Sequence, residues 1–269
     1  MTIHLRSISL QHWQEQEPGG FPFNLPLVRT LETLEFNSPV TFFVGENGSG
    51  KSTLLEAIAC AVGSITVGSE SVSTDKTLAD VRRLSAQLKT SWTKRTHKGF
   101  FLRAEDFFGY ARRMAQTRAE LEEDLRQADR ESQGRSIAAA QYGRMPFAHE
   151  LSDLNQRYGS GLDAHSHGES FLALFQSRFV PGGLYLLDEP EAPLSPIRQM
   201  AMISLLREMT KQESQFIIAT HSPILMAFPD AIINDFDRLP LQTVSYGDLE
   251  HVRLTRDFLD NPDAYLNRL

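Results

Sequence analysis

The hydrophobic residues of this chain fall into short continuous runs separated by longer amphipathic stretches. The runs at 40–45, 183–189 and 215–220 are almost entirely apolar, which predicts strands that a parallel sheet buries on both faces. Residues 3–13 instead alternate apolar and polar side chains, as a strand with one buried face does, and Pro and Gly at 17–26 interrupt them. The pattern therefore predicts an α/β protein.

Amphipathic stretches with the spacing of helices follow two of these runs. Residues 51–63 continue directly from the first run with helical spacing. Ser195 suits an N-cap and Pro196 suits the first helical position, and residues 197–209 carry apolar side chains three and four positions apart. We expect strand, helix, strand units with right-handed crossovers.

The middle of the chain, about 77–165, has a different composition. Residues 105–132 are highly charged and predict one long solvated helix, whereas 133–147 predict irregular structure. We interpret this part as a helical lobe inserted into the sheet domain. In the tail we expect edge strands at 231–237 and 241–249 and a closing helix at 255–269.

The composition is that of a globular protein with a sizeable core. The chain has 269 residues, and its net charge of −7 argues against a surface that binds polyanions everywhere while leaving room for a local basic patch. Cys60 lies in an apolar run, where a small buried residue is expected instead of a reactive thiol. Because neither a signal peptide nor a stretch of about 18 apolar residues is found, we expect a soluble, cytoplasmic protein without membrane insertion.

Candidate chemistry begins at residues 45–53, GENGSGKST. This segment matches the pattern G-x-x-x-x-G-K-[ST] and has the strand before it and the helix after it that a phosphate-binding loop requires. The plainer alternative is a glycine turn beside a surface lysine. Glycines let such a loop wrap tightly, so backbone N–H groups can point at phosphate oxygens in front of the positive helix end. The expected nucleotide-binding residues are Gly45, Asn47, Gly48, Ser49, Gly50, Lys51, Ser52 and Thr53.

Three of these side chains have separate expected roles. Lys51 would neutralise the β- and γ-phosphates, Ser52 would place its hydroxyl on Mg²⁺, and Thr53 would reach the α-phosphate.

Acidic residues and a histidine follow the other apolar runs. Asp188 ends the run at 183–189 and suits a partner of Mg²⁺ through water, and Glu189 beside it could polarise attacking water as a general base. His221 follows the run at 215–220, where an imidazole could contact the γ-phosphate and tie it to Glu189. The alternatives are an acidic pair that caps a strand and a structural histidine.

With these residues in place, the chain resembles the ABC-type ATPase domain, in the soluble branch that contains the SMC, RecF-like and overcoming-lysogenization-defect ATPases. The match spans essentially the whole chain. Five motifs carry it in order: GENGSGKST, GFFLRAEDFF, SHGES, YLLDEPEAPLSP and ATHSP.

The resemblance implies a P-loop NTPase fold with a mainly parallel sheet core, an N-terminal antiparallel β part and an inserted helical lobe. It implies one ATPase domain over 1–269, with the core at 1–76 and 181–269 and the lobe at about 77–180. It also implies ATP and Mg²⁺ as cofactors. Ser166 and Gly168 of the signature-like loop would complete the nucleotide site of a second copy, so that ATP joins a homodimer and hydrolysis releases it.

The chain departs from the family pattern in places. Arg103 stands where a glutamine is common; it could meet phosphate but could not ligate Mg²⁺, which makes Glu105 the better candidate for sensing the metal. His167 and Glu169 replace the more usual glycine and glutamine of the signature, and Ser195 replaces an aspartate. The dimer contacts are therefore expected to differ from those of the family.

The function expected from this resemblance is a soluble, ATP-gated dimer that acts on an unidentified macromolecular partner, with DNA maintenance or defence as candidate processes. The alternative is the nucleotide-binding subunit of a membrane transporter; a small-molecule kinase is a third.

A basic segment at 89–103, which includes Lys94 and Arg95 around Trp92, could contact nucleic acid, or could be an exposed hairpin of alternating charge. Trp13 and Phe36 are candidates for stacking on the base.

Overall fold

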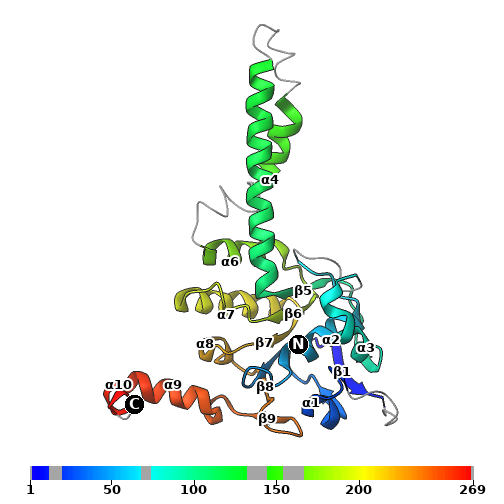
Figure 1. Ribbon diagram of the computed structural model, residues 1–269, viewed down its shortest axis with the longest axis vertical. Helices are drawn as coiled ribbons and strands as arrows, with labels where there is room; N and C mark the ends of the chain where they lie inside the picture. The colour runs from blue at the N-terminus through cyan, green and yellow to red at the C-terminus, as the bar shows by residue number, and fades with distance from the viewer. Residues whose placement is uncertain (1, 12–19, 68–73, 132–143, 154–166, 268–269) are drawn as a thin grey trace.

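The structure is a computed structural model that describes residues 2–11, 20–67, 74–131, 144–153 and 167–267. Figure 1 shows a layered α/β body from which one long helix projects. The elements are β1 (Leu5–Leu10), α1 (Pro26–Thr30), β2 (Thr33–Glu35), β3 (Val40–Val44), α2 (Lys51–Val62), η1 (Lys76–Leu78), α3 (Ala79–Ser85), β4 (Leu88–Trp92), β5 (Gly99–Arg103), α4 (Ala104–Glu131), α6 (His167–Arg178), β6 (Leu184–Asp188), α7 (Pro196–Lys211), β7 (Gln215–Ala219), α8 (Pro223–Met226), β8 (Ile232–Asp235), β9 (Gln242–Val244), η2 (Tyr246–Asp248), α9 (Glu250–Asp260) and α10 (Pro262–Leu266).

The main sheet has six strands in the order β5-β6-β7-β3-β8-β9. Its first five strands pair in parallel, and β9 pairs antiparallel with β8. The three apolar runs form its centre as β3, β6 and β7, which confirms the prediction of strands buried on both faces. The tail prediction is half right, because β9 lies at the edge whereas β8 pairs on both sides.

A second sheet, in the order β2-β1-β4, is antiparallel throughout, which confirms the expected N-terminal antiparallel part. The helix α2 packs between this sheet and one face of the main sheet, and α3 packs against α2. Their apolar residues form a shared core with β1, β3 and β7, and that core includes Leu54, Ile58, Leu84 and Phe43. The helix that follows the phosphate loop is therefore fixed by packing on both of its sides.

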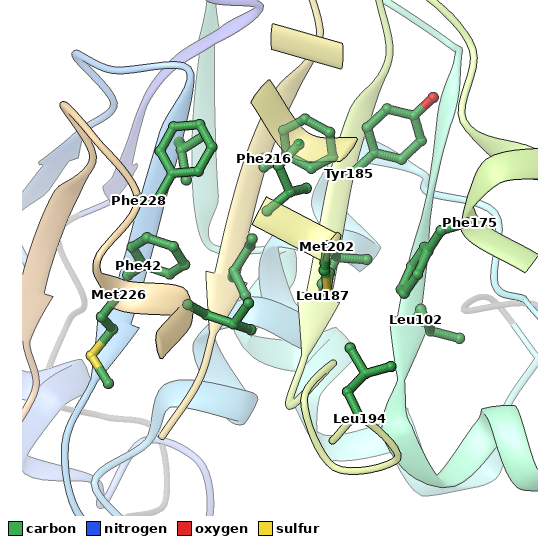
Figure 2. Close-up of a cluster of buried hydrophobic side chains, with 14 of the residues drawn as sticks. Phe42, Leu102, Phe175, Tyr185, Leu187, Leu194, Met202, Phe216, Met226 and Phe228 are labelled. Carbon is green, nitrogen blue, oxygen red and sulfur yellow. The ribbon is translucent and has the colours of Figure 1, made fainter. Parts of the chain in front are cut away.

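The opposite face of the main sheet is covered by α6, α7 and α8. Figure 2 shows this core, in which Tyr185 and Phe216 of neighbouring strands stack with ring centroids 5.1 Å apart. Phe175 of α6 and Met202 of α7 are fully buried against them. Ser195 takes the N-cap position of α7 and Pro196 its first turn, as expected, although the Ser195 hydroxyl makes no capping hydrogen bond.

The charged segment forms one helix, α4, of 28 residues that stands away from the body (Figure 1), so that prediction is confirmed. The expected start of the lobe near residue 77 is too early, since β4 and β5 belong to the two sheets and α4 begins only at Ala104. Residues 144–153 are helical, so the part of the expected irregular segment that the structure describes is instead the start of a helix. The closing helix is divided into α9 and α10, where Asn261 precedes a proline and caps α10.

Candidate functional site

The phosphate loop connects β3 to α2 and requires glycine at both of its ends. Gly45 has φ +152°, and a β-carbon there would lie 2.9 Å from Asp237 Oδ1 and 3.0 Å from Ser49 Oγ. Gly50 has φ +100°, and a β-carbon there would lie 2.9 Å from Leu27 Cδ2. Any larger residue would displace these neighbours, so the loop keeps its tight path only with glycine.

Within the loop, most backbone donors at the start of the helix remain available to a ligand. The first N–H groups of α2 have no acceptor inside the helix, and the positive end of the helix lies behind them. The N–H of Ser49 is an exception to the expectation that the loop N–H groups point at phosphate, because it donates to Glu46 O at 3.2 Å. Ser49 Oγ is buried and has no hydrogen-bond partner within the described residues.

Lys51 is buried at the start of α2. Its Nζ donates to Gly45 O at 2.7 Å and to Glu46 O at 2.9 Å. Burial lowers the pKa of Lys51, and the surrounding carboxylates, Asp237 first, oppose that shift. The ammonium group is thus held by two neutral carbonyls, which a triphosphate can replace with a stronger charge-assisted contact.

Asp188 lies at the carboxyl end of β6, beside the phosphate loop. Its Oδ1 accepts a hydrogen bond from Ser52 Oγ at 3.1 Å, so the structure brings together two of the expected metal ligands. Burial raises the pKa of Asp188 to about 7, and the carboxylates of Glu56 and Glu189 act in the same direction. The site favours a cation that would neutralise this carboxylate.

Glu189 and His221 lie together at the ends of β6 and β7. Glu189 adopts φ +49°, which is unusual for a residue with a side chain, and its N–H donates to Ala219 O at 2.9 Å. Its Oε1 lies 3.7 Å from His221 Nε2. The backbone of Glu189 is held in a left-handed conformation of the kind that clusters at functional sites.

Glu191 is a functional candidate that the sequence interpretation missed. Its Oε1 accepts from Thr220 Oγ1 at 2.6 Å and from the backbone N–H of His221 at 2.7 Å. Burial raises the pKa of Glu191, and the hydrogen bond from Thr220 opposes the shift. The sequence does carry a signal for it. The segment DEPE, residues 188–191, holds three carboxylates in four positions, and a turn after a strand does not require the third.

A cleft of about 690 Å³ borders the phosphate loop on the side of β8 and α9. Its lining includes Glu46, Asp237 and His221 from the loop and the strand ends, and His251 and Leu254 from α9. Asp237 accepts the N–H of Glu46 at 2.8 Å, so it supports the first turn of the loop. Burial lowers the pKa of His251, and the nearby His221 acts in the same direction.

The expectation that Arg103 could meet phosphate is wrong. Arg103 is buried, with Nη2 2.9 Å from Asp75 Oδ2 and Nη1 3.4 Å from Glu56 Oε1. Although burial opposes it, hydrogen bonds from Thr77 and the contact with Arg103 hold the pKa of Asp75 below its usual value. The guanidinium joins three elements, β5, α2 and the turn before η1, and its role is structural.

Several expected residues lie at the limits of what the structure describes. Glu105 is in the first turn of α4 and Gly168 in the first turn of α6, and for both only the backbone position is described. Ser166 and Trp13 lie outside the described residues. Phe36 is fully buried in the core beneath β1, so it cannot stack on a base.

The basic segment at 89–103 is not a hairpin, because β4 and β5 belong to different sheets. Lys94 Nζ lies 3.7 Å from Glu213 Oε2, and Arg95 packs 5.9 Å from the Trp92 ring. Arg103 is buried elsewhere, as described above. The segment is therefore a smaller and partly neutralised patch, which weakens the nucleic-acid hypothesis.

The oxygen ligands of the site fit Mg²⁺ bound together with a triphosphate. Magnesium prefers hard oxygen ligands and usually combines one or two protein ligands with phosphates and waters. The contact between Ser52 and Asp188 supplies such a pair. No group of three or more His, Cys, Asp or Glu side chains in the described part of the chain could enclose a metal by itself.

Two family models match separate parts of the chain. The model described as "AAA domain" matches residues 25–99, which include the phosphate loop. The model described as "AAA domain, putative AbiEii toxin, Type IV TA system" matches residues 170–227, which include Asp188, Glu189 and His221. No curated protein matches the chain.

Solved structures resemble the chain over most of its length at low identity. The Smc head domain of Pyrococcus furiosus, bound to the C-terminal domain of ScpA, is 13% identical with a TM-score of 0.45, over 95% of this chain and 99% of that one. The SMC head domain from Thermotoga maritima is 17% identical with a TM-score of 0.41, over 87% and 94%. An ATP-binding cassette of an ABC transporter in its ADP conformation is 16% identical with a TM-score of 0.43, over 86% of each chain. Among the helices that the structure describes, none combines the length and the apolar character needed to cross a membrane.

Proposed function

We propose that this chain, an ATP-hydrolysing enzyme with an ABC- and SMC-like ATPase domain, works as a homodimer that ATP closes and hydrolysis opens. The two family matches and the α/β fold confirm the resemblance to such ATPases that the five motifs indicate. In the proposed dimer, Ser166 and Gly168 of one copy complete the nucleotide site of the other. The whole chain, 1–269, acts as one ATPase domain on a macromolecular partner, with DNA maintenance or defence as the proposed process.

The observation that carries the dimer is the exposure of the acid and switch residues. The side chains of Glu189 and His221 are 46% and 40% exposed, whereas hydrolysis is favoured in a site that excludes bulk water. A second copy placed against this edge of the sheet would cover both. The amino end of α6 would then direct its positive end at the nucleotide of the other copy.

The proposed reaction assigns one task to each group. Lys51 exchanges its two loop carbonyls for the β- and γ-phosphates, and Ser52 and Asp188 would hold Mg²⁺, which stabilises the phosphate charge when bound. Glu189 accepts the proton of the attacking water. His221, 3.7 Å from Glu189, binds the γ-phosphate through Nε2, a buried atom that has no hydrogen-bond partner among the described residues.

Sedimentation velocity of Glu189→Gln tests this proposal. The variant should bind ATP with Mg²⁺, hydrolyse it slowly and shift from monomer to dimer when both are added. Lys51→Ala is the matched control, because it should remain monomeric under the same conditions. A Glu189→Gln chain that binds ATP and remains a monomer would refute the proposed dimer.

Capture of partners by the same trapped dimer addresses what the ATPase acts on. A nucleic acid or a soluble protein recovered only with ATP supports the proposed process. Recovery of a membrane protein instead supports the transporter alternative, in which the same site drives a separate transmembrane subunit.

A further inference from the structure

Glu191 connects the acidic loop after β6 to the switch segment after β7. One oxygen, Oε1, accepts both the Thr220 hydroxyl at 2.6 Å and the His221 N–H at 2.7 Å. The same Thr220 hydroxyl accepts the N–H of Ser222 at 3.0 Å. A single carboxylate oxygen therefore organises three consecutive residues that lie about thirty positions away in sequence.

The surroundings of Glu191 are unusual for a carboxylate that serves only to cap a turn. Its second oxygen, Oε2, is buried and has no hydrogen-bond partner within the described chain. Burying a carboxylate is unfavourable, and a strand end could be capped by a shorter, neutral residue at lower cost. The fold nevertheless keeps the ionisable carboxyl group of Glu191 between these two loops.

The position of His221 depends on this connection. Glu189 is fixed from its own backbone, through its N–H bond to Ala219 O and the turn bond from Ala192 N to Glu189 O at 3.1 Å. His221 follows β7 and precedes α8, and its backbone N–H donates to Glu191. The distance of 3.7 Å between the His221 ring and Glu189 is thus set across two loops that Glu191 joins.

We infer that Glu191 is a positioning residue for hydrolysis, which holds the His221 backbone and Thr220 so that the imidazole faces the γ-phosphate and Glu189. The inference rests on the proposed role of His221. Glu191 acts as a hydrogen-bond acceptor through Oε1 and does not touch the nucleotide. Loss of this acceptor should therefore slow the chemical step and leave nucleotide binding unchanged.

Steady-state kinetics of Glu191→Ala tests the inference, with Glu208→Ala, an exposed carboxylate on α7, as the matched control. We expect kcat to fall by about 30- to 100-fold with KM within about twofold, because a small misplacement of a catalytic group can cost about that much. The control should keep the parental kcat. Thermal melting identifies any loss of folding separately.

The conservative variant Glu191→Gln keeps an acceptor oxygen at the same position. We expect its kcat within about fivefold of the parental value, since a neutral acceptor forms a weaker bond than a charged one. If Glu191→Gln is as slow as Glu191→Ala, the carboxylate acts through its charge and the positioning role is wrong. This variant preserves shape and volume, so it remains informative if the alanine variant does not fold.

A double variant separates positioning from an independent effect. His221→Ala alone should slow hydrolysis by about 10²- to 10³-fold, and adding Glu191→Gln or Glu191→Ala should cause little further loss. A full additional loss would overturn the inference. If His221→Ala hydrolyses at the parental rate, the proposed role of His221 fails instead. The kinetic comparison does not depend on whether ATP closes a dimer, which sedimentation reports separately.

Discussion

Two charged clusters lie at neighbouring strand ends of the main sheet, and they are built in opposite ways. Arg103 at the end of β5 pairs in register with Asp188 at the end of β6. Around Arg103 each carboxylate has a cationic partner, since the guanidinium contacts both Asp75 and Glu56 and all three side chains are largely buried. The first cluster is complete within the chain.

The second cluster has negative groups without a matching cation. Asp188, Glu189 and Glu191 lie within four positions of the chain, and the nearby Lys51 donates to loop carbonyls. Within the described residues, no ion pair with Lys or Arg satisfies Asp188 or Glu189. A charge cluster that is complete serves the fold, whereas an incomplete one beside a phosphate loop is suited to a cation and a triphosphate.

The largest effect is expected for Glu189→Gln, which alters the second cluster and should slow hydrolysis. Loss of the general base should lower kcat by roughly 10²- to 10⁴-fold while ATP affinity is kept. Single-turnover hydrolysis and nucleotide titration measure the two quantities. Glu208→Gln, which removes an exposed carboxylate, should behave like the parent, and a Glu189→Gln chain with parental kcat would exclude Glu189 as the base.

The second-largest effect is expected for Arg103→Met, which disrupts the first cluster and lowers stability. It leaves Asp75 and Glu56 buried without their cation, so the free energy of unfolding should fall by roughly 3–5 kcal/mol. Urea denaturation measures the change. The control Arg126→Met removes an exposed pair on α4 and should cost less than about 1 kcal/mol. Equal losses in the two variants would show that the Arg103 cluster is not a structural unit.

Asp188→Asn should stabilise the protein in the absence of nucleotide and metal, while it abolishes hydrolysis. The pKa of Asp188 is raised from 3.8 to about 7, so the folded state binds a proton that the unfolded state releases, and stability falls as pH rises through this range. At pH 8 the variant avoids a penalty of at most about 4 kcal/mol, whereas near pH 4 it gains little. Thermal melting in EDTA at both pH values tests this, and a gain that is equal at the two values would contradict it.

Lys51→Ala should have the smallest effect of the four on free energy. Losing one charge-assisted contact should weaken ATP binding by about 1.5–3 kcal/mol, or roughly 10- to 100-fold. Isothermal titration measures the affinity. Lys211→Ala, on the exposed end of α7, is the matched control. Retained affinity in Lys51→Ala would mean that the loop does not bind the triphosphate as proposed.

The sequence predicts one of these clusters better than the other for a physical reason. Asp188 ends one strongly apolar run, and the loop that leads to Lys51 follows another. Because parallel strands bring their carboxyl ends to one edge, the local pattern is enough to place the two residues together. The sequence does not predict the ion pairs of Arg103, because its partners, Asp75 and Glu56, come from segments 28 and 47 residues away and no periodicity identifies them. Glu191 was missed for the same reason.

The helical lobe shows the same limit. The charged pattern predicts the length of α4. The pairing of β4 and β5 depends on sheet partners that are distant in sequence, so the pattern does not predict that the lobe begins only at Ala104. The sequence makes Phe36 a candidate for stacking on the base, but in the structure its side chain is fully buried. Burial and long-range pairing, which a single sequence does not report, decide such cases.

Complementation between two inactive chains tests the central claim most directly. Lys51→Ala removes the phosphate contact of a copy and leaves its signature segment intact, whereas Ser166→Arg alters the signature segment and leaves the phosphate loop intact. If each site is built from two copies, mixing the two variants should restore part of the parental ATPase activity, because one site of each mixed dimer is complete. A mixture as inactive as its separate components, or a Ser166→Arg chain that hydrolyses ATP at the parental rate alone, would contradict the account.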